Sequence, residues 1–301
     1  MYFYLEWIDK RPSQIQLVHE KPLKLTFESK FKIKAKEYII CGNINPEFKP
    51  YIVSEPIVYR KNQYLLSHLQ KCVRRMESTK SVQTAKHLLD LDCTSLLRRL
   101  PIIMLEDVTF HESFPVLIWL MIAYSKKFTM KQEIVKWILG VVYYISTCSQ
   151  KTHYETKDIN EIDCSDNQNI YVDSLRFRKA YGGMKGDMNM IEYYTQLLYR
   201  DKLGPRTEKI KLIKLEIKPL LKKEWIYQSN DFHCNRSIII QMQRYFSEYS
   251  KDYLKELIWN HSSSINNRII DNDKIYDTKQ LEDWKRIEKT LHSIQKKCIY
   301  Y

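Results

Sequence analysis

Short runs of β-branched and aromatic residues, separated by turn residues, fill the first part of the chain. The runs cover residues 2–8, 14–18, 23–27, 31–35, 38–41 and 51–59. Prolines and Gly42 separate most of them, as is typical of short strands joined by turns. This pattern predicts a small antiparallel β subdomain over residues 1–60.

Beyond this part, apolar residues recur at the three- and four-residue steps of a helix. The pattern covers residues 64–76, 82–89, 96–100 and 130–147. Pro101 is expected to interrupt the third of these helices. The run 114–124 is apolar throughout but has only about half of the ~20 residues that span a bilayer, so it predicts a buried helix and no membrane partner. Together these segments predict a compact helical bundle over residues 61–148.

The second half of the chain begins with a polar, acidic stretch that shows neither period. This stretch, residues 149–175, predicts an acidic linker or an exposed excursion. Helical patterns then return over 188–201, 206–218, 235–259 and 278–298. They predict a basic helical region over residues 176–301. The expected fold class is mainly α with a small β part, an α+β protein whose N-terminal antiparallel β subdomain precedes helical bundles.

One stretch of the predicted bundle has a recognisable order of residues. These are Ser67, Leu69, Lys71, Arg74, Ala85, Leu88, Arg98, Arg99, Leu100, Glu106, Asp107, Pro115 and Ala123. Residues 67–123 thereby resemble the helical region behind the ATPase domain of clamp-loader-type AAA+ proteins. The similarity is to the replication-associated recombination family, which includes the Werner-helicase-interacting proteins. It implies a collar-like bundle that packs subunits together at replication forks.

The chain departs from that family in its nucleotide-binding motifs. It has no G-x-x-x-x-G-K-[ST] phosphate loop and no strand ending in an acid where a Walker B segment would stand, so ATP hydrolysis is not expected. A simpler interpretation of the same stretch is structural. In it, Arg98 and Arg99 pair with Glu106 and Asp107 to close a helix-turn-helix.

The charge of the chain is strongly basic and unevenly distributed. Its 49 Lys and Arg against 36 Asp and Glu give a net charge of +13. Residues 176–225 contribute 13 basic and 6 acidic side chains, or +7, more than half of that excess. Concentrated positive charge favours polyanionic partners, above all nucleic acid. The bias toward Lys, Ile and Tyr, with few alanines, is what an AT-rich genome produces.

A glycine-rich turn stands inside this basic region. Three of the six glycines of the chain, Gly182, Gly183 and Gly186, lie within five positions, which indicates left-handed torsions or a close backbone approach. Asp187 is expected to cap a helix that begins near Met188. A turn of this kind before a helix exposes N–H groups that attract phosphate.

Basic residues surround the turn and continue beyond it. The predicted phosphate-binding residues are Arg176, Arg178, Lys179, Gly182, Gly183, Lys185, Gly186, Lys209, Lys211 and Lys214. The last three belong to a stretch, 206–218, that alternates lysines with aliphatic residues and is ambiguous between a strand and a helix. An alternative remains open, in which the glycines only permit packing and Asp187 satisfies the helix N-terminus.

The cysteines and the N-terminus bear on the compartment. Seven cysteines are scattered without close pairs, which is typical of a reducing environment. The N-terminal residues show no secretory pattern. An intracellular location is expected, in the cytoplasm or nucleus, with a virion as a further setting.

Candidate catalytic and metal-binding residues are few. Asp231, His233 and Cys234 could form a hidden active or metal site, and Cys148, His153 and Cys164 a zinc site, but neither set has a metal-binding spacing. No hydrolase, metalloprotease or dinucleotide-binding motif is present. We therefore expect no cofactor, no metal and no catalytic residue.

These observations favour a non-enzymatic protein that binds nucleic acid, DNA rather than RNA, through the glycine turn and the lysines after it. Its setting would be replication, recombination or expression of an AT-rich genome, such as that of a virus. Two alternatives remain. One is a virion-structural or interaction scaffold that forms homo-oligomers or binds a protein partner through residues 62–148. The other is a divergent nucleic-acid-processing enzyme.

Overall fold

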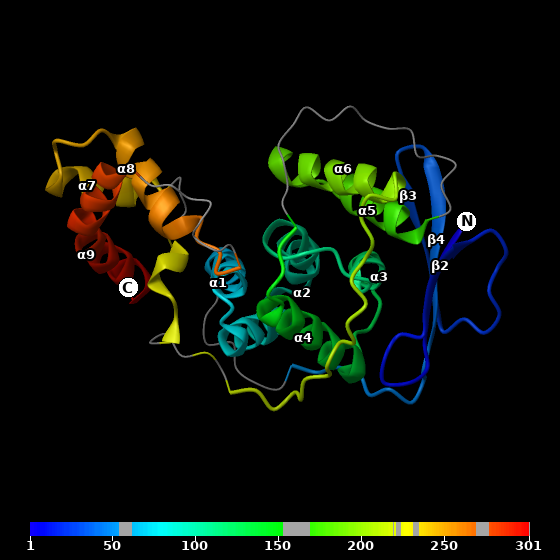
Figure 1. Cartoon of the computed structure of the whole chain (residues 1–301). Helices are drawn as coiled ribbons and strands as arrows, with labels where there is room; N and C mark the ends of the chain where they lie inside the picture. Colours follow the sequence, from blue (N-terminus) through cyan, green and yellow to red (C-terminus); the bar gives the residue numbers. More distant parts are fainter. Residues whose placement is uncertain are drawn as a thin grey trace.

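The computed structural model describes residues 1–53, 62–152, 169–218, 220, 224–230, 235–268 and 277–300. Within these ranges the chain is mainly α-helical with one small sheet, which confirms the predicted fold class. A four-stranded sheet stands at one end of a layered group of helices, and a second group of helices lies at the other end (Figure 1).

The sheet consists of β1 (Tyr2–Trp7), β2 (Gln14–Val18), β3 (Phe27–Ile33) and β4 (Lys36–Ile44) in the order β2-β1-β4-β3. The hairpins β1–β2 and β3–β4 are antiparallel, but β1 and β4 pair in parallel. The prediction of a purely antiparallel sheet was therefore wrong. The strands β1 and β4 have the most buried side chains and lie at the centre of the sheet. The alternation of hydrophobic residues predicts which strands are buried, but not whether they pair in parallel or antiparallel.

The boundaries of β3 and β4 also differ from the predicted runs. Residues 27–33 form one strand, because the chain turns only after it, at Lys34, which has a left-handed φ of 53°. The predicted strand at 51–59 lies outside the described residues from 54 onward, and 51–53 form no strand.

The first helical layer contains α1 (Asn62–Arg74), α2 (Ser78–Asp107), α3 (Phe114–Ser125) and α4 (Gln132–Thr147). The break in α2 is at Asp92, whose φ is −157° and ψ 78°, and helix continues through Pro101. The Asp92 carboxylate accepts the Ser95 N–H at 3.0 Å, as an N-cap does at the start of a helix. The sequence signal for this break is therefore a capping aspartate, and the expectation of a break at Pro101 was wrong.

One face of the sheet packs against α3 and α5 (Figure 1). Trp119 of α3 is fully buried there, and its Nε1–H donates to the carbonyls of Phe3 at 3.1 Å and Cys41 at 3.0 Å. These carbonyls belong to the two central strands. Gly42 makes this approach possible, since a Cβ there would lie 2.9 Å from the Trp119 ring. Trp137 is also buried, against Trp7, so neither α3 nor α4 offers its tryptophan to a partner.

The helices α5 (Ile170–Ala180) and α6 (Lys185–Tyr199) join the same large core as the sheet and α1 to α4. Helix therefore begins five residues before the end of the predicted linker, whose residues 153–168 lie outside the described ranges. After α6, residues 203–218 are extended and contain neither helix nor strand. The helix expected at 206–218 was wrong, because the backbone of this segment forms hydrogen bonds with distant parts of the larger core, including residues 110–112, Arg11 and Lys136 of α4.

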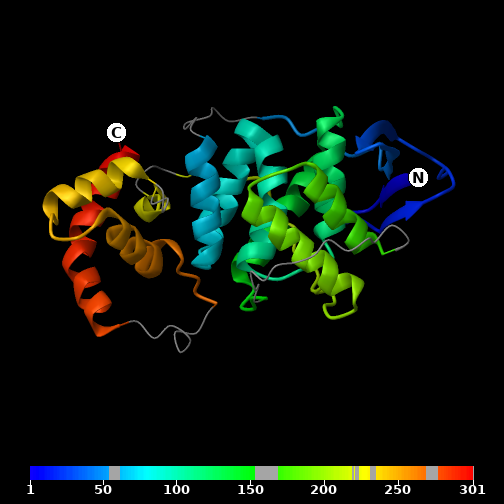
Figure 2. The same cartoon turned by 90° about the horizontal axis from the view of Figure 1, so that it is seen from above.

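The C-terminal helices form a smaller, second core. It contains α7 (Arg236–Tyr245), α8 (Lys251–Ile258) and α9 (Thr278–Tyr300), and the short turns η2 (Tyr227–Asn230) and η3 (Trp259–Ser263) lie beside them. This unit lies next to α1, at the end of the molecule opposite the sheet (Figures 1 and 2). The predicted region 176–301 is thus divided between two cores. No helix in the described ranges is both long and apolar enough to cross a bilayer.

The bond from Trp119 to the central strands leads to the first prediction. Trp119→Phe keeps an aromatic ring but removes the donor to two buried carbonyls, and it should lower the free energy of unfolding by about 1–3 kcal/mol in urea titrations. Trp7→Phe is the matched control, because Trp7 is equally buried in the same core and its Nε1 has no hydrogen-bond partner among the described residues. Equal losses in the two variants would contradict the role given to the Trp119 hydrogen bonds.

Candidate functional site

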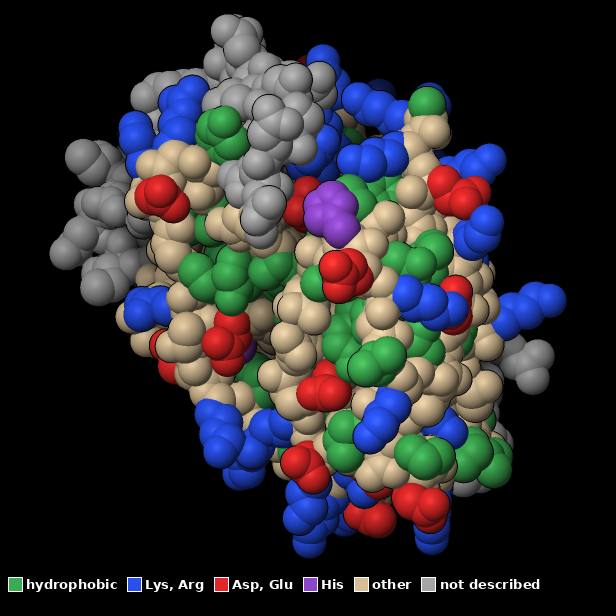
Figure 3. Space-filling view, turned by 90° about the vertical axis from the view of Figure 1, so that its right-hand side faces the viewer, with side chains coloured by type: hydrophobic (Ala, Val, Ile, Leu, Met, Phe, Trp, Pro, Cys, Tyr) green, Lys and Arg blue, Asp and Glu red, His purple; other side chains and the backbone are tan. Residues whose placement is uncertain are grey.

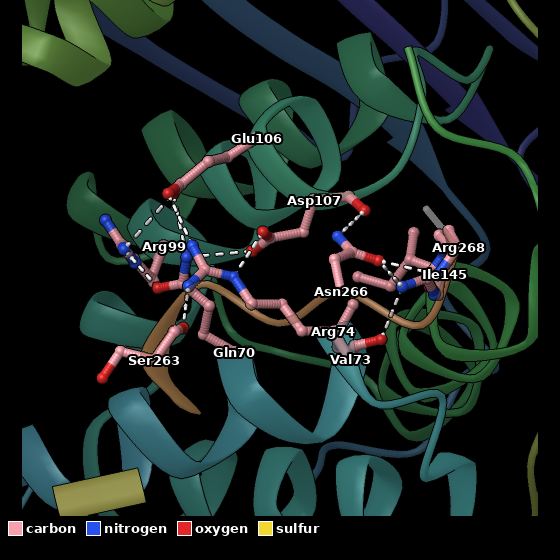
Figure 4. Close-up of polar contacts among 10 residues, drawn as sticks. All are labelled: Gln70, Val73, Arg74, Arg99, Glu106, Asp107, Ile145, Ser263, Asn266 and Arg268. Atoms are coloured by element: carbon pink, nitrogen blue, oxygen red, sulfur yellow. Dashed lines mark hydrogen bonds and ion pairs between the residues drawn. The ribbon is translucent and has the colours of Figure 1, made fainter. Parts of the chain in front are cut away.

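The densest polar cluster lies where α1, α2 and α4 end beside the C-terminal unit (Figure 4). The last carbonyls of a helix lack donors within the helix, and here residues 266–268 provide them. Arg268 donates from Nη1 to Val73 O at 2.7 Å, from Nε to Cys148 O at 2.7 Å, and from Nη2 to Ile145 O. Asn266 donates to Asp107 O at 2.9 Å. One short segment of the C-terminal unit therefore caps three helices of the larger core.

Two carboxylates at the end of α2 extend this cluster. Arg74 donates to Asp107 at 2.5 Å and to Glu106 at 2.7 Å, and also to Ser263 O at 2.9 Å. Gln70 donates to both carboxylates at 2.9 Å. Burial and the neighbouring negative charge of Asp107 raise the pKa of Glu106 above its usual value. Asp107 is thus enclosed by donors from α1, whereas the Glu106 side chain remains 34 % exposed. Through Arg74, both carboxylates are linked to the Ser263 carbonyl of the C-terminal unit.

The predicted pairing of Arg98 and Arg99 with Glu106 and Asp107 is confirmed only for Arg99 with Glu106. Arg99 lies 3.7 Å from Glu106 and 3.4 Å from Asp187. Arg98 instead donates to the Tyr181 carbonyl at 2.8 Å. The residues do not close a helix-turn-helix, because they all lie in one piece of α2 after the break at Asp92.

The glycine turn ends α5 and begins α6. Gly182 has a left-handed φ of 73° and donates its N–H to Lys179 O at 2.9 Å, which confirms the expected use of glycine at a helix end. Asp187 does not cap α6, because that helix begins at Lys185 with Met184 in the capping position. Gly183 and Gly186 are exposed.

The cations around this turn are largely engaged inside the protein. Arg178 is 3 % exposed, and its guanidinium donates to the carbonyls of Arg98 and Gly182. Burial lowers its pKa to about 10. Lys179 pairs with Glu192 at 2.9 Å, and Arg176 lies 3.5 Å from Asp173. The predicted phosphate contact of Arg178 does not fit this burial, and Lys185 is the exposed cation that the turn itself presents.

The lysines of the extended segment are placed differently. Lys209, Lys211, Lys214 and Lys218 are exposed, whereas the aliphatic residues between them are partly or fully buried. Three contacts hold this segment on the larger core, from Arg11 Nε to Ile210 O at 3.0 Å, from Ile213 N to Lys136 O at 3.1 Å, and from Gln83 to Lys218 O at 3.2 Å. We call these four lysines the lysine track.

A glycine that sequence reasoning missed makes this attachment possible. A Cβ on Gly140 of α4 would lie 2.1 Å from the Lys211 carbonyl, so only glycine lets the extended segment lie flat on the helix. The signal was a lone glycine inside an apolar helix, which often marks a close backbone approach. Arg11 and Arg268 attach distant segments through hydrogen bonds to backbone carbonyls. No sequence pattern around either arginine predicts this role.

The two halves of the predicted phosphate site lie apart. The glycine turn rests on α2 through Arg98, whereas the lysine track rests on α4. Figure 1 shows α5 and α6 above α2 and α3, with the extended segment passing α4 below them. The structure therefore does not gather all ten predicted residues on one surface.

Comparison with known proteins adds no candidate site. No protein-family model matches the chain, and neither a curated protein nor a solved structure is similar to it. The resemblance of residues 67–123 to a clamp-loader collar stays a prediction. Within the described residues, no three His, Cys, Asp or Glu side chains could hold a metal ion together. His153, Cys164, Asp231, His233 and Cys234 lie outside those residues.

The capping arginine leads to a prediction on stability. Arg268→Gln removes the charged donors from three buried carbonyls and should lower the free energy of unfolding by about 3 kcal/mol or more, as measured by urea titration followed by circular dichroism. Arg244→Gln, on an exposed position of α7, is the control for the lost charge. The interpretation fails when both variants unfold at the same urea concentration.

Asp173 leads to a prediction on pH. Burial raises its pKa from 3.8 to about 6, against the opposing effect of Arg176. The folded state therefore holds a proton that the unfolded state releases, and stability is lost as pH rises from about 4 through 6. Asp173→Asn should remove this loss and be more stable than the wild type at pH 8 by about 3 kcal/mol. Asp252→Asn, at a side chain 92 % exposed, should leave the pH profile unchanged.

Proposed function

We propose that the protein binds the sugar-phosphate backbone of nucleic acid along the lysine track. The observation that carries this proposal is the alternation of residues 209–218, which places four lysines in solvent and anchors the aliphatic residues between them. The same ten residues contain a single acid, Glu216. The track is thus a fixed row of positive charge.

The chemistry of lysine suits contact with the backbone. Its ammonium group is a compact charge on a flexible stem and needs no planar partner. Phosphate contacts of this kind position a protein on nucleic acid without reading its sequence. The track therefore favours binding that is electrostatic, depends strongly on salt, and tolerates many sequences.

Further basic residues lie near the track. Lys136, whose carbonyl accepts the Ile213 N–H, lies in α4, and Lys131 precedes that helix. Lys49 is exposed, and its carbonyl accepts the N–H of Gln132 at the start of α4. Of these three, Lys49 is the exposed one, because Lys131 and Lys136 are half-buried and Lys136 lies 3.7 Å from Glu133.

The outer face of the sheet offers a weaker candidate. In the view from the sheet end, Lys and Arg side chains lie mainly around the margins, with acidic and hydrophobic side chains across the middle (Figure 3). Some of its lysines are also paired, such as Lys30 with Glu37 at 3.0 Å. A polyanion would meet mixed charge there, so we assign backbone binding to the track. The expectation of DNA rather than RNA, and of a role in replication, recombination or expression, is part of the proposal.

The proposal is tested by removing three charges of the track. The triple variant carries Lys209→Gln, Lys211→Gln and Lys214→Gln together. Its affinity for a 20-nucleotide DNA should fall, and the slope of log affinity against log salt should become smaller by about three units. When salt rises from 50 to 200 mM, the wild type should therefore lose about 40-fold more affinity for duplex DNA than the triple variant does. Fluorescence anisotropy on single-stranded and duplex DNA measures both quantities.

The matched control changes the same number of charges elsewhere. A second triple variant alters three exposed lysines of α9 by Lys279→Gln, Lys285→Gln and Lys289→Gln. It should keep the wild-type salt slope. An equal loss in both triple variants would show that net charge alone drives binding, and an affinity that does not respond to salt would overturn the proposal.

A further inference from the structure

A pocket of about 250 Å³ opens where the lysine track begins. Five parts of the chain that are distant in sequence form it. They are the β1–β2 turn with Arg11, the start of α3 with Glu112 and Ser113, Trp137 of α4, Tyr171 in the first turn of α5, and residues 209–210. The pocket thus depends on the tertiary fold and joins the track directly through Lys209.

Two cations line this pocket. Arg11 donates from Nε to the Ile210 carbonyl, which fixes the guanidinium at the pocket. Within the described part of the chain, its two terminal nitrogens make no hydrogen bond or ion pair, and neither does the Lys209 ammonium. Arginine binds phosphate through parallel N–H donors. The two residues therefore supply positive charge and N–H donors to a phosphate group at the start of the track.

His111 and Ser113 form an uncharged part of the pocket lining beside these cations. His111 is fully buried, and its Nδ1 accepts the Ser113 N–H at 3.0 Å. Its proton is therefore on Nε2, which donates to the Glu208 carbonyl at 2.9 Å. Burial lowers the pKa of this imidazole and keeps it neutral. The ring holds the residue before Lys209 in place, so the lysine starts from a fixed backbone position.

The remaining lining residues restrict the ligand further. Glu112 places one carboxylate at the pocket, which disfavours a ligand that is anionic throughout. A carboxylate can accept a hydrogen bond from the amino group of a base, and the half-buried ring of Tyr171 offers an apolar surface, whereas Trp137 is only 2 % exposed. The pocket is slightly smaller than the 300 Å³ at which small-ligand sites commonly begin. This volume restricts the ligand to a small group such as a single terminal nucleotide.

We propose that this pocket receives the terminal nucleotide of a nucleic-acid strand, whose terminal phosphate pairs with Arg11 and Lys209 while the strand follows the lysine track. This inference rests on the proposed function, since the track supplies the rest of the binding surface. It adds recognition of phosphorylated strand ends to backbone binding that is otherwise independent of sequence.

The test compares three single-stranded 12-nucleotide DNAs that carry a 5′-phosphate, a 3′-phosphate or no terminal phosphate. Fluorescence anisotropy at fixed salt gives the affinity of the wild-type protein for each. One of the phosphorylated strands should bind about tenfold more tightly than the unphosphorylated strand, as a charge-assisted pair with arginine allows. Arg11→Gln should abolish this preference. Because Arg11 also anchors the track at Ile210, the quantity compared is the ratio of the affinities of each protein for the phosphorylated and the unphosphorylated strand, which should fall to about one.

Two further variants guard against a loss of local structure in Arg11→Gln. Arg11→Lys keeps the charge but loses the paired donors, so it should keep only part of the preference. Lys209→Gln changes an exposed side chain and should also reduce the preference. Equal affinity of the wild type for all three strands would overturn the pocket and leave the track intact. If no strand binds at all, both the track and the pocket are wrong.

Discussion

The arrangement of the two cores depends on how the ends of α1, α2 and α4 are satisfied. Helix ends concentrate partial negative charge on their last carbonyls, and three such ends meet in this protein. Arg268 and Asn266 donate to these carbonyls from the C-terminal unit, and the Val73 carbonyl also accepts the Met76 N–H. Because a buried carbonyl without a partner is costly, this short segment fixes the C-terminal helices against the larger core.

The same principle determines which cations remain free to bind a ligand. Arg74, Arg178 and Arg268 are taken up by carboxylates and carbonyls inside the protein. The lysines of the track are exposed because their segment is anchored to the larger core through its backbone. Among their side chains, Lys211 also lies over the Tyr143 ring of α4 at 5.7 Å. A high positive charge in the sequence thus divides into an internal part that holds helices together and an external part that can meet a polyanion.

The track and its pocket follow from one arrangement of the backbone. Gly140 lets the extended segment lie on α4, and Arg11 holds the segment at Ile210. The arginine that anchors the start of the track also lines the pocket there. In the proposed complex, the contact of Arg11 with the Ile210 carbonyl would set both the place of the track and the place of the pocket for the end of the nucleic acid. One surface would then bind the backbone in general and the phosphorylated end in particular.

The sequence by itself determined the helices with clear three- and four-residue periods, the presence of a small sheet, and the exposure of Lys209, Lys211 and Lys214, because each depends on local alternation of polar and apolar residues. Only the tertiary structure decided the parallel pairing of β1 with β4, the burial of Arg178, and the extended path of residues 203–218. These features depend on partners that are distant along the chain. The pocket at Arg11 also depends on distant partners, since five separate segments form it and none carries a signal alone.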